Sequence, residues 1–336
     1  MTLLLRRSSV LGLAAGLCLG LAGAPAFAQS TLAPVVPKAV TEGSELKDAP
    51  SLPSRLAATS LLLDVTTAGE RLVAVGEWGH IVYSDDQGAS WTQATVPVDV
   101  TLTSIAFADA KNGWAVGHDA VILHSADAGQ TWTVQSKQPE LEQPLFSVYF
   151  SDAQNGFAVG AYSLYMTTAD GGATWTQKKI GDSDFHMNGI FKAKSGELLI
   201  AGEAGHVFRS KDKGENWEIL QTPYSGSFWN GLGLEDGSVL VFGMRGNIWH
   251  SADGGTTWNQ VANKSTSSIQ SGRILSDGRV VLIGLEGTVQ ISKDGGKTFV
   301  YAPRDDRAAM AALIQTKDGV IHVFGEEGAK TQTLTE

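Results

Sequence analysis

The sequence is poor in cysteine, and its single cysteine, Cys18, lies in a Leu-, Ala- and Gly-rich run near the N-terminus. This run follows Arg6 and Arg7 and leads to a small-x-small cleavage motif at residues 26–28. Residues 1–28 are therefore predicted to be a cleaved secretory signal peptide, which implies a periplasmic location. The chain that remains has no cysteine, which excludes disulfides, a thiol nucleophile and a thiolate metal site.

Long apolar runs and an excess of positive charge are also absent after the signal. No later segment is apolar over enough residues to cross a bilayer, so we expect no direct membrane insertion of the mature chain. The whole sequence has 25 Lys and Arg against 35 Asp and Glu, a net charge of −10. Loss of Arg6 and Arg7 with the signal makes the protein more acidic still. Because such a protein repels phosphate groups, we expect no nucleic-acid partner.

The sequence is rich in one phrase, Ser-x-Asp-x-Gly-x-Thr-Trp, which occurs six times at a nearly constant interval. The closing aromatic residues are Trp91, Trp132, Trp175, Trp217, Trp258 and Phe299. A period of about 40 residues with strand-like content is typical of propeller blades. Each repeat contains alternating or continuous apolar segments between Gly-containing turns, which predicts four strands in a blade.

The repeated phrase has the chemistry of a tight turn. Its aspartate can accept hydrogen bonds from nearby backbone amides, and its glycine supplies a backbone angle that other residues disfavour. A calcium loop needs a spaced set of oxygen ligands, whereas each copy here offers only one or two carboxylates. We therefore interpret the aspartates as structural turn formers: Asp86, Asp127, Asp170, Asp212, Asp253 and Asp294.

The number of blades follows from the second strands, which end in a glycine. There are seven such segments, from Val75-Gly76 to Phe324-Gly325, although there are only six Ser-x-Asp phrases. We predict an all-β fold, a seven-bladed β-propeller with four-stranded antiparallel blades over residues 55–336. Residues 29–54 are predicted to be an N-terminal arm, and the segment near 33–54 to supply the missing outer strand of the last blade. Six blades with a frayed tail is the alternative.

The repeat resembles the photosystem II stability/assembly factor-like family, whose phrase is known as the Asp-box or bacterial neuraminidase repeat. The best matches are 156–175 and 113–132, where an Ala-Val-Gly-type strand precedes the box. The resemblance implies a propeller, with the box on the third-to-fourth-strand hairpin, that needs no cofactor or metal and is not an enzyme. For a non-photosynthetic bacterial member it implies an exported assembly, stability or accessory factor. The expected partner is an envelope membrane protein or protein complex, with a transporter as one candidate.

In a propeller the second-to-third-strand loops and the inter-blade loops share one face, opposite the Asp-boxes. A fold alone does not give a function, so the function has to be inferred from the residues of that face. Aromatic loop residues are favoured interface anchors, and acidic tips set the potential of a docking face. The predicted partner-binding residues are Trp78, His118, Asp119, Tyr162, Glu203, Trp229, Arg245, Glu286, Glu326 and Glu327. For Trp229, packing between blades is the favoured interpretation, and for Trp78 the two interpretations are balanced.

Two chemical alternatives involve the same loops. His118, His186 and His206 lack a metal-ligand spacing, so hydrogen-bonded loop histidines are favoured over a metal site. The loop glutamates could form the acid pair of a glycosidase. The chain has no Arg-Ile-Pro motif and no convincing arginine triad, as a sialidase would need. We therefore predict no catalytic residues, and a glycan-binding or glycoside-hydrolysing Asp-box propeller remains the alternative.

Overall fold

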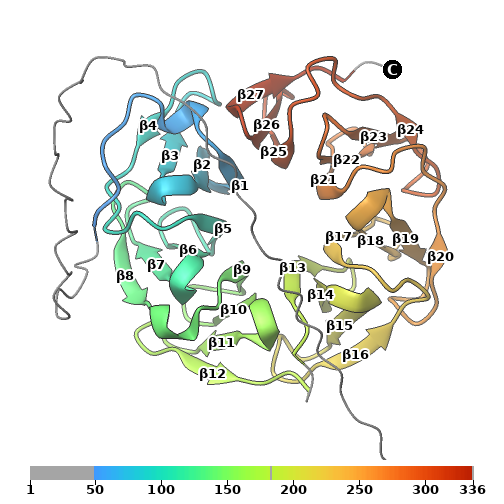
Figure 1. The fold of residues 1–336 in the computed structure, drawn as a ribbon, viewed down its shortest axis with the longest axis horizontal. Helices are drawn as coiled ribbons and strands as arrows, with labels where there is room; N and C mark the ends of the chain where they lie inside the picture. The colour runs from blue at the N-terminus through green and yellow to red at the C-terminus, as the bar shows by residue number, and fades with distance from the viewer. Residues whose placement is uncertain (1–48, 182–183, 335–336) are drawn as a thin grey trace, which may run out of the picture. The chain divides into compact units, whose positions relative to one another are not determined.

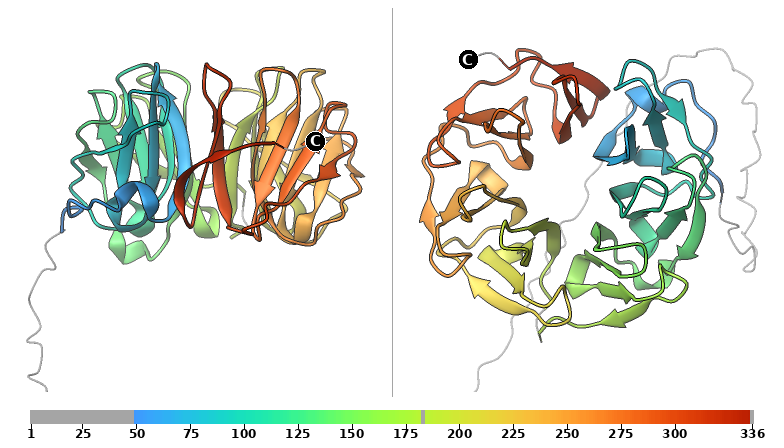
Figure 2. Two further views of the ribbon diagram at one scale, coloured as in Figure 1. Left: turned by 90° about the horizontal axis from the view of Figure 1, so that it is seen from above. Right: turned by 180° about the vertical axis from the view of Figure 1, so that it is seen from behind.

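The computed structural model describes residues 49–181 and 184–334, which form seven antiparallel β-sheets set around a ring (Figures 1 and 2). Within each sheet the strands are paired in chain order. The prediction of a seven-bladed propeller is confirmed. The predicted signal peptide, 1–28, and residues 29–48 of the arm lie outside the described residues. No helix within the described ranges has the length and hydropathy to cross a membrane.

The first three blades each have four strands. Blade 1 contains β1 (Leu62–Ala68), β2 (Arg71–Gly76), β3 (Ile81–Ser84) and β4 (Thr92–Gln93). Blade 2 contains β5 (Leu102–Phe107), β6 (Gly113–Gly117), β7 (Ile122–Ser125) and β8 (Thr133–Ser136). Blade 3 contains β9 (Leu145–Phe150), β10 (Gly156–Gly160), β11 (Tyr165–Thr168) and β12 (Thr176–Lys178).

Blades 4 to 6 repeat this arrangement, and blade 7 has three strands. Blade 4 contains β13 (Met187–Lys192), β14 (Leu198–Gly202), β15 (His206–Ser210) and β16 (Glu218–Gln221). Blade 5 contains β17 (Phe228–Gly233), β18 (Val239–Gly243), β19 (Ile248–Ser251) and β20 (Asn259–Gln260). Blade 6 contains β21 (Ile269–Ile274), β22 (Val280–Gly284), β23 (Val289–Ser292) and β24 (Val300–Tyr301). Blade 7 contains β25 (Met310–Gln315), β26 (Ile321–Gly325) and β27 (Gly328–Gln332).

Short 3-10 turns precede the first strand or join later ones. They are η1 (Ala57–Thr59), η2 (Glu77–Gly79), η3 (His118–Ala120), η4 (Pro139–Leu141), η5 (Ala161–Ser163), η6 (Glu203–Gly205) and η7 (Met244–Gly246). Five of them, η2, η3, η5, η6 and η7, connect the second strand of a blade to its third. These turns therefore place equivalent residues of successive blades at one end of the ring.

The second strands are continuous apolar runs because they lie inside the sheets. Every residue of β6 and of β14 is buried. Neither strand shows the alternation of buried and exposed residues that is expected when one face of a sheet contacts solvent. The glycine that ends the second strand is required by close approach. A Cβ on Gly76 would lie 2.0 Å from the carbonyl oxygen of Leu61, so the chain entering β1 can pass only over a glycine.

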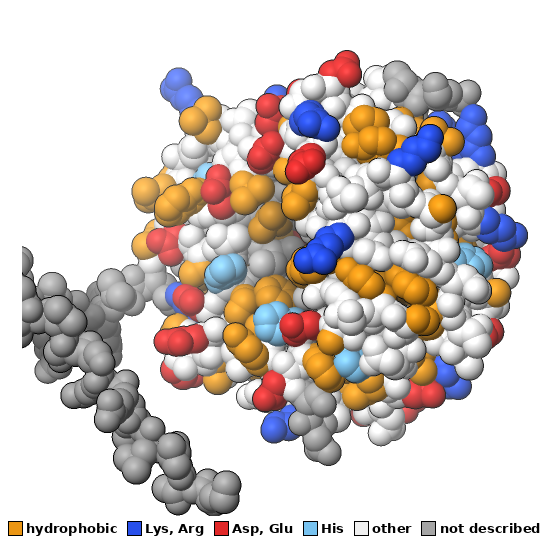
Figure 3. All heavy atoms as spheres, turned by 45° about the vertical axis from the view of Figure 1, so that its right-hand side comes forward, with side chains coloured by type: hydrophobic (Ala, Val, Ile, Leu, Met, Phe, Trp, Pro, Cys, Tyr) orange, Lys and Arg blue, Asp and Glu red, His pale blue; other side chains and the backbone are white. Residues whose placement is uncertain are grey.

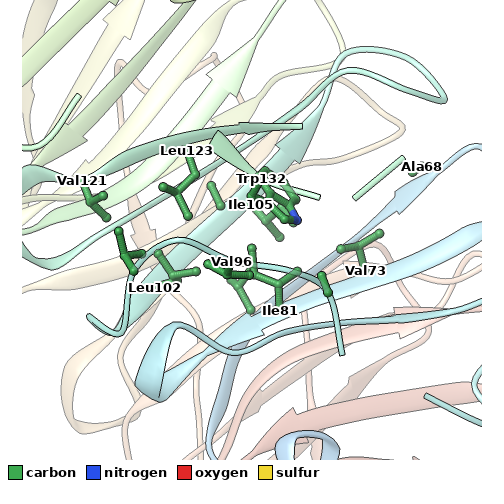
Figure 4. Packing of buried hydrophobic residues seen from close by; sticks show 13 residues of the cluster. Ala68, Val73, Ile81, Val96, Leu102, Ile105, Val121, Leu123 and Trp132 are labelled. Atoms are coloured by element: carbon green, nitrogen blue, oxygen red, sulfur yellow. The ribbon is translucent and has the colours of Figure 1, made fainter. Parts of the chain in front are cut away.

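The hydrophobic core is divided among the seven junctions between neighbouring blades. At the junction of blades 1 and 2, Trp132 of the second blade packs with Val73 and Ile81 of the first (Figure 4). Trp132 is buried, and its indole nitrogen donates to the carbonyl oxygen of Gly129 at 3.0 Å. Burying a large side chain of this kind stabilises a fold by roughly 1.5–3 kcal/mol. Each box aromatic thus connects its own blade to the one before it.

The ring closes between blade 7 and blade 1, where β25 contacts β1. The seventh sheet has three strands among the described residues. Of the predicted closing segment 33–54, residues 33–48 lie outside the described residues. The part that is described lies against blade 1 and does not pair with β27. The Ser51 amide donates to the Val96 carbonyl at 3.1 Å, and the Ser54 amide donates to the Gln93 side chain at 2.7 Å.

Candidate partner-binding face

The second-to-third-strand turns present one residue each at their middle position. In six of them this residue has a left-handed backbone with φ between 50° and 57°: Trp78, Asp119, Tyr162, Ala204, Arg245 and Glu286. The residue after it also has a positive φ, and it is a glycine such as Gly79 in four of these turns and Ala120 or Ser163 in the other two. Because the same backbone recurs with unlike side chains, the conformation belongs to the repeat. The identity of the middle residue, which we call the tip, is free to vary.

Two of the tips are exposed aromatic side chains. Trp78 is 64% exposed and Tyr162 is 55% exposed. The Trp78 carbonyl accepts a hydrogen bond from the Ser51 hydroxyl at 2.8 Å, which connects this turn to the chain before the first blade. The Tyr162 ring meets the His186 ring edge-on, with centroids 4.8 Å apart. The structure therefore places the backbone of both residues firmly while leaving much of each side chain open to solvent.

The acidic residues predicted for this face fall into two groups that differ in what their carboxylates contact. Glu203 and Glu326 occupy the first position of their turns, as Glu77 does in blade 1. Each of the three accepts a hydrogen bond from a backbone amide just before the first strand of its own blade. The Glu326 carboxylate, for example, accepts from the Ala309 amide at 2.8 Å. Glu203 and Glu326 thus have a local structural role that sequence reasoning missed, although their recurrence at one repeat position was a usable signal.

The tip carboxylates make weaker or more peripheral contacts. Asp119 faces the ammonium group of Lys137 at 3.8 Å, and Glu327 faces that of Lys330 at 3.9 Å. Glu286 accepts a hydrogen bond from the Ser267 hydroxyl at 2.8 Å. The Glu327–Lys330 pair lies between exposed side chains, where ion pairs contribute little to stability, whereas Lys137 is mostly buried. Asp119, Glu286 and Glu327 are therefore the acids best placed to meet another molecule.

The histidines of these loops are involved in packing and hydrogen bonds. The His206 ring stacks on the Phe185 ring, with centroids 4.0 Å apart, and its Nδ1 lies 2.9 Å from the Glu203 carbonyl oxygen. His118 is exposed at the first position of its turn. Across residues 49–181 and 184–334, no three His, Cys, Asp or Glu side chains group as a metal site would require.

The last two predicted residues differ in their placement. Arg245 is a tip, and its amide donates to the Ser268 hydroxyl at 3.3 Å. Trp229 lies in β17, the first strand of blade 5, at the irregularity where Phe228 and Asn230 oppose consecutive residues of β18. Its indole nitrogen is buried and has no hydrogen-bond partner within the described residues. Trp229 is thus a strand residue, while the other nine predicted residues lie in loops.

The Asp-boxes lie between the third and fourth strands, away from these turns. In blade 2 the Ser125 hydroxyl donates to Asp127 at 2.8 Å and accepts from the Gly129 amide at 2.9 Å. The Asp127 carboxylate also accepts from the amide and the hydroxyl of Thr131, at 3.0 and 2.6 Å. The same pattern recurs in the other five boxes. Each carboxylate closes its own loop.

These hydrogen bonds favour the charged form of the box carboxylates. The Ser90 hydroxyl and amide lower the pKa of Asp86 to about 2, and the Asn216 side chain and amide lower that of Asp212 to about 2. The Thr257 amide and hydroxyl have the same effect on the pKa of Asp253. A low pKa is thus explained by turn structure at these positions, without a catalytic role.

A half-buried carboxylate that sequence reasoning missed connects the first two blades. Asp64 of β1 accepts from the Ser104 hydroxyl at 2.9 Å and from the Ile105 amide at 3.0 Å, both in β5. Burial raises the pKa of Asp64, while these hydrogen bonds and the charge of Arg273 oppose that rise. Burial also lowers the pKa of Arg273. No repeat pattern marks Asp64, because its partners come from a different blade.

Comparison with known families identifies the repeat. A family model described as photosynthesis system II assembly factor YCF48 matches residues 83–144 and 134–285, which together make up more than half of the chain. The chain belongs to this family. The resemblance predicted from the strand and box motifs is confirmed. No curated protein sequence matches the chain.

Members of this family and other propellers are similar in structure. A structure of YCF48 bound to D1 peptide has 19% identity and a TM-score of 0.69, over 86% of this chain and 100% of that chain. YCF48 from Cyanidioschyzon merolae has 16% identity and a TM-score of 0.66, over 83% and 96%. A streptogramin B lyase has 12% identity and a TM-score of 0.69, over 84% and 97%. At these identities the likeness shows the fold alone.

Proposed function

We propose that the chain is an exported, non-enzymatic scaffold for the assembly or stability of an envelope membrane-protein complex, such as a transporter. It would act by holding an exposed segment of one subunit against the turn tips. Membership of the YCF48 assembly-factor family supports this proposal, as does a relative that is described in complex with a peptide. The observation that carries it is the ring of second-to-third-strand turns, in six of which the tips differ while their backbone is the same. Blade 7 has a two-residue turn, Glu326-Glu327, at the equivalent place.

The order of the tips suggests the chemistry of the partner. Going round the ring from blade 6 through blades 7, 1 and 2 to blade 3, the tips are Glu286, Glu327, Trp78, Asp119 and Tyr162. Carboxylates attract Lys and Arg side chains during encounter, and exposed aromatic faces hold the same cations at short range. Acidic and apolar side chains are also neighbours on the side of the molecule seen in Figure 3. The partner segment is therefore expected to be basic.

A binding role also agrees with the structural roles of the box aspartates and of two loop glutamates. The lowered pKa values of Asp86, Asp212 and Asp253 arise from their box turns. Glu203 and Glu326 accept backbone hydrogen bonds. A cavity of about 510 Å³ between blades 3 and 4 is lined by box residues and lies away from the tips. These features favour a protein-docking face over a glycosidase site.

The proposal is tested by recovery of a partner from solubilised envelope with the mature protein, residues 29–336. The Trp78→Ala, Tyr162→Ala double variant removes the two aromatic tips, and we expect recovery to fall at least about tenfold because aromatic anchors set the dissociation rate. The Glu286→Lys, Glu327→Lys double variant should slow association and weaken its salt dependence. Both variants should stay folded, because exposed loop changes move stability little.

The matched control is Val300→Ala, because Val300 is 64% exposed, as Trp78 is, but lies on the outermost strand of blade 6. This variant should recover the partner as the unmodified protein does. If both double variants also recover it fully, the tips are not the binding site. Hydrolysis of an aryl glycoside that is lost on changing one loop carboxylate would contradict the scaffold proposal and support the glycosidase alternative.

A further inference from the structure

The seventh blade ends in a strand that is paired on one side. Within the described residues β27 pairs only with β26, whereas the third strand of each other blade also pairs with a fourth strand. Alternate residues of an antiparallel strand turn their N–H and C=O groups away from the partner strand. The outer side of β27 therefore presents a row of backbone groups ready to pair with an added strand.

The junction between blades 6 and 7 also lacks a side chain that the other junctions have. At each of the other six, the box aromatic of the following blade packs into the core: Trp91, Trp132, Trp175, Trp217, Trp258 or Phe299. Among the described residues the seventh blade has no box aromatic, and Leu334 packs against the core of this junction instead. This side chain is smaller than an indole ring and comes from the end of the chain.

A cavity of about 390 Å³ lies at this junction. Its apolar lining consists of Val289, Ile291, Ala302 and Pro303 from blade 6 and its exit, and Leu334 after β27. The polar side chains of Arg304, Asp305, Asp306, Thr331, Gln332 and Thr333 line the rest. The repeat places these blade 6 residues where blade 1 has the residues that pack with Trp132. The free edge and the cavity therefore lie at one place, where the described part of blade 7 has neither a fourth strand nor a box aromatic.

We propose that residues 33–48 of this chain add to β27 as the fourth strand of blade 7 and place an apolar side chain in the cavity. Val35, Val36 and Val40 are the candidates for that side chain. Pro34 and Pro37 are compatible with this position, because proline is tolerated in an outermost strand.

The position of the described chain supports its own N-terminal segment as the occupant. Residues 57–59 already lie against β27, where a Cβ on Gly328 would be 2.2 Å from the Ala58 carbonyl oxygen. Sixteen extended residues reach about 50 Å, which is enough to pass back around one blade. A tethered segment also acts at high effective concentration, whereas the exposed Lys330 on the edge discourages pairing with another molecule.

The test is hydrogen exchange of the β27 amides in the mature protein, residues 29–336. Deletion of residues 29–48, or the triple change Val35→Ser, Val36→Ser, Val40→Ser, should raise exchange of the outward-facing amides at least about tenfold. The matched control Glu42→Gln, Glu45→Gln alters the same segment and should leave exchange unchanged. Adding a synthetic peptide of residues 29–48 to the deleted protein should restore the protection.

Three results would overturn the proposal. The first is equal protection of the β27 amides with and without residues 29–48. The second is protection that disappears on dilution, with light scattering showing a dimer, since a second copy would then be the occupant. The third is protection that appears only with envelope extract, which would assign the edge to a partner. Tryptophan fluorescence shows in each case that the ring is folded, and none of these results depends on the turn tips.

Discussion

The ring of Trp91 in blade 1 meets the ring of Phe324 in blade 7 edge-on, with centroids 5.6 Å apart and an interplanar angle of 86°. This contact belongs to the core that closes the propeller. Trp91→Ala should lower the free energy of unfolding by about 3 kcal/mol, because it leaves a cavity in that core. Denaturant titration measures the change. Val134→Ala, an exposed site on an outer strand, should change it by less than about 0.5 kcal/mol.

The Asp-box hydrogen bonds give a second stability prediction. Ser125 is 1% exposed, and its hydroxyl accepts from the buried Gly129 amide. Ser125→Ala should therefore cost about 1–3 kcal/mol, the usual effect of leaving a buried donor unpaired. The control is Thr133→Ala, which removes an exposed hydroxyl from the next strand. Equal melting temperatures for Ser125→Ala and the unmodified protein would show that the box does not depend on this hydroxyl.

Acid should weaken the boxes over a defined pH range. The folded pKa of Asp212 is about 2, below the value of about 4 expected for an unfolded chain. The stabilisation is present above pH 4 and is lost as the pH falls toward 2, because the unfolded chain takes up protons first. In Asp212→Asn the melting temperature should fall less steeply between pH 4 and 2. Asp99→Asn, at an exposed inter-blade position, should keep the original slope.

His322 is an exception at its repeat position. The corresponding second-strand residues of the other blades are apolar and buried: Val73, Trp114, Phe157, Leu199, Leu240 and Val281. Burial lowers the pKa of His322, and its Nε2 is buried without a hydrogen-bond partner among the described residues. The neutral ring is favoured in the folded state, so stability falls as the pH drops below about 6.5.

His322→Leu restores the apolar residue of the repeat and should raise the free energy of unfolding by roughly 1 kcal/mol at pH 7. It should also remove part of the fall in melting temperature between pH 7 and 5. Thermal unfolding at these two pH values measures both effects. A lower stability of His322→Leu at both pH values would mean that the imidazole makes a necessary contact between blades 7 and 1.

Features that repeat in the sequence were the predictable ones. The glycine-ended second strands gave the number of blades, the box spacing gave their period and placed Asp86 between a third and a fourth strand, and the glycine after Val75 located the tip Trp78. The hydrogen bond from the His186 amide to Glu203 was not predictable from local pattern, since it depends on how a turn meets the strand before it. The path of residues 49–54 along blade 1 was also not predictable from the sequence, because the Ser51 amide meets the Val96 carbonyl only in the folded ring.

The shared backbone of the turns separates folding from recognition. Trp78, Ala204 and Arg245 adopt the same left-handed conformation although their side chains have nothing in common. A change at one tip therefore leaves the geometry of the other tips unaltered. Under the function proposed above, such a surface could exchange one client for another by single substitutions, without passing through an unstable intermediate sequence.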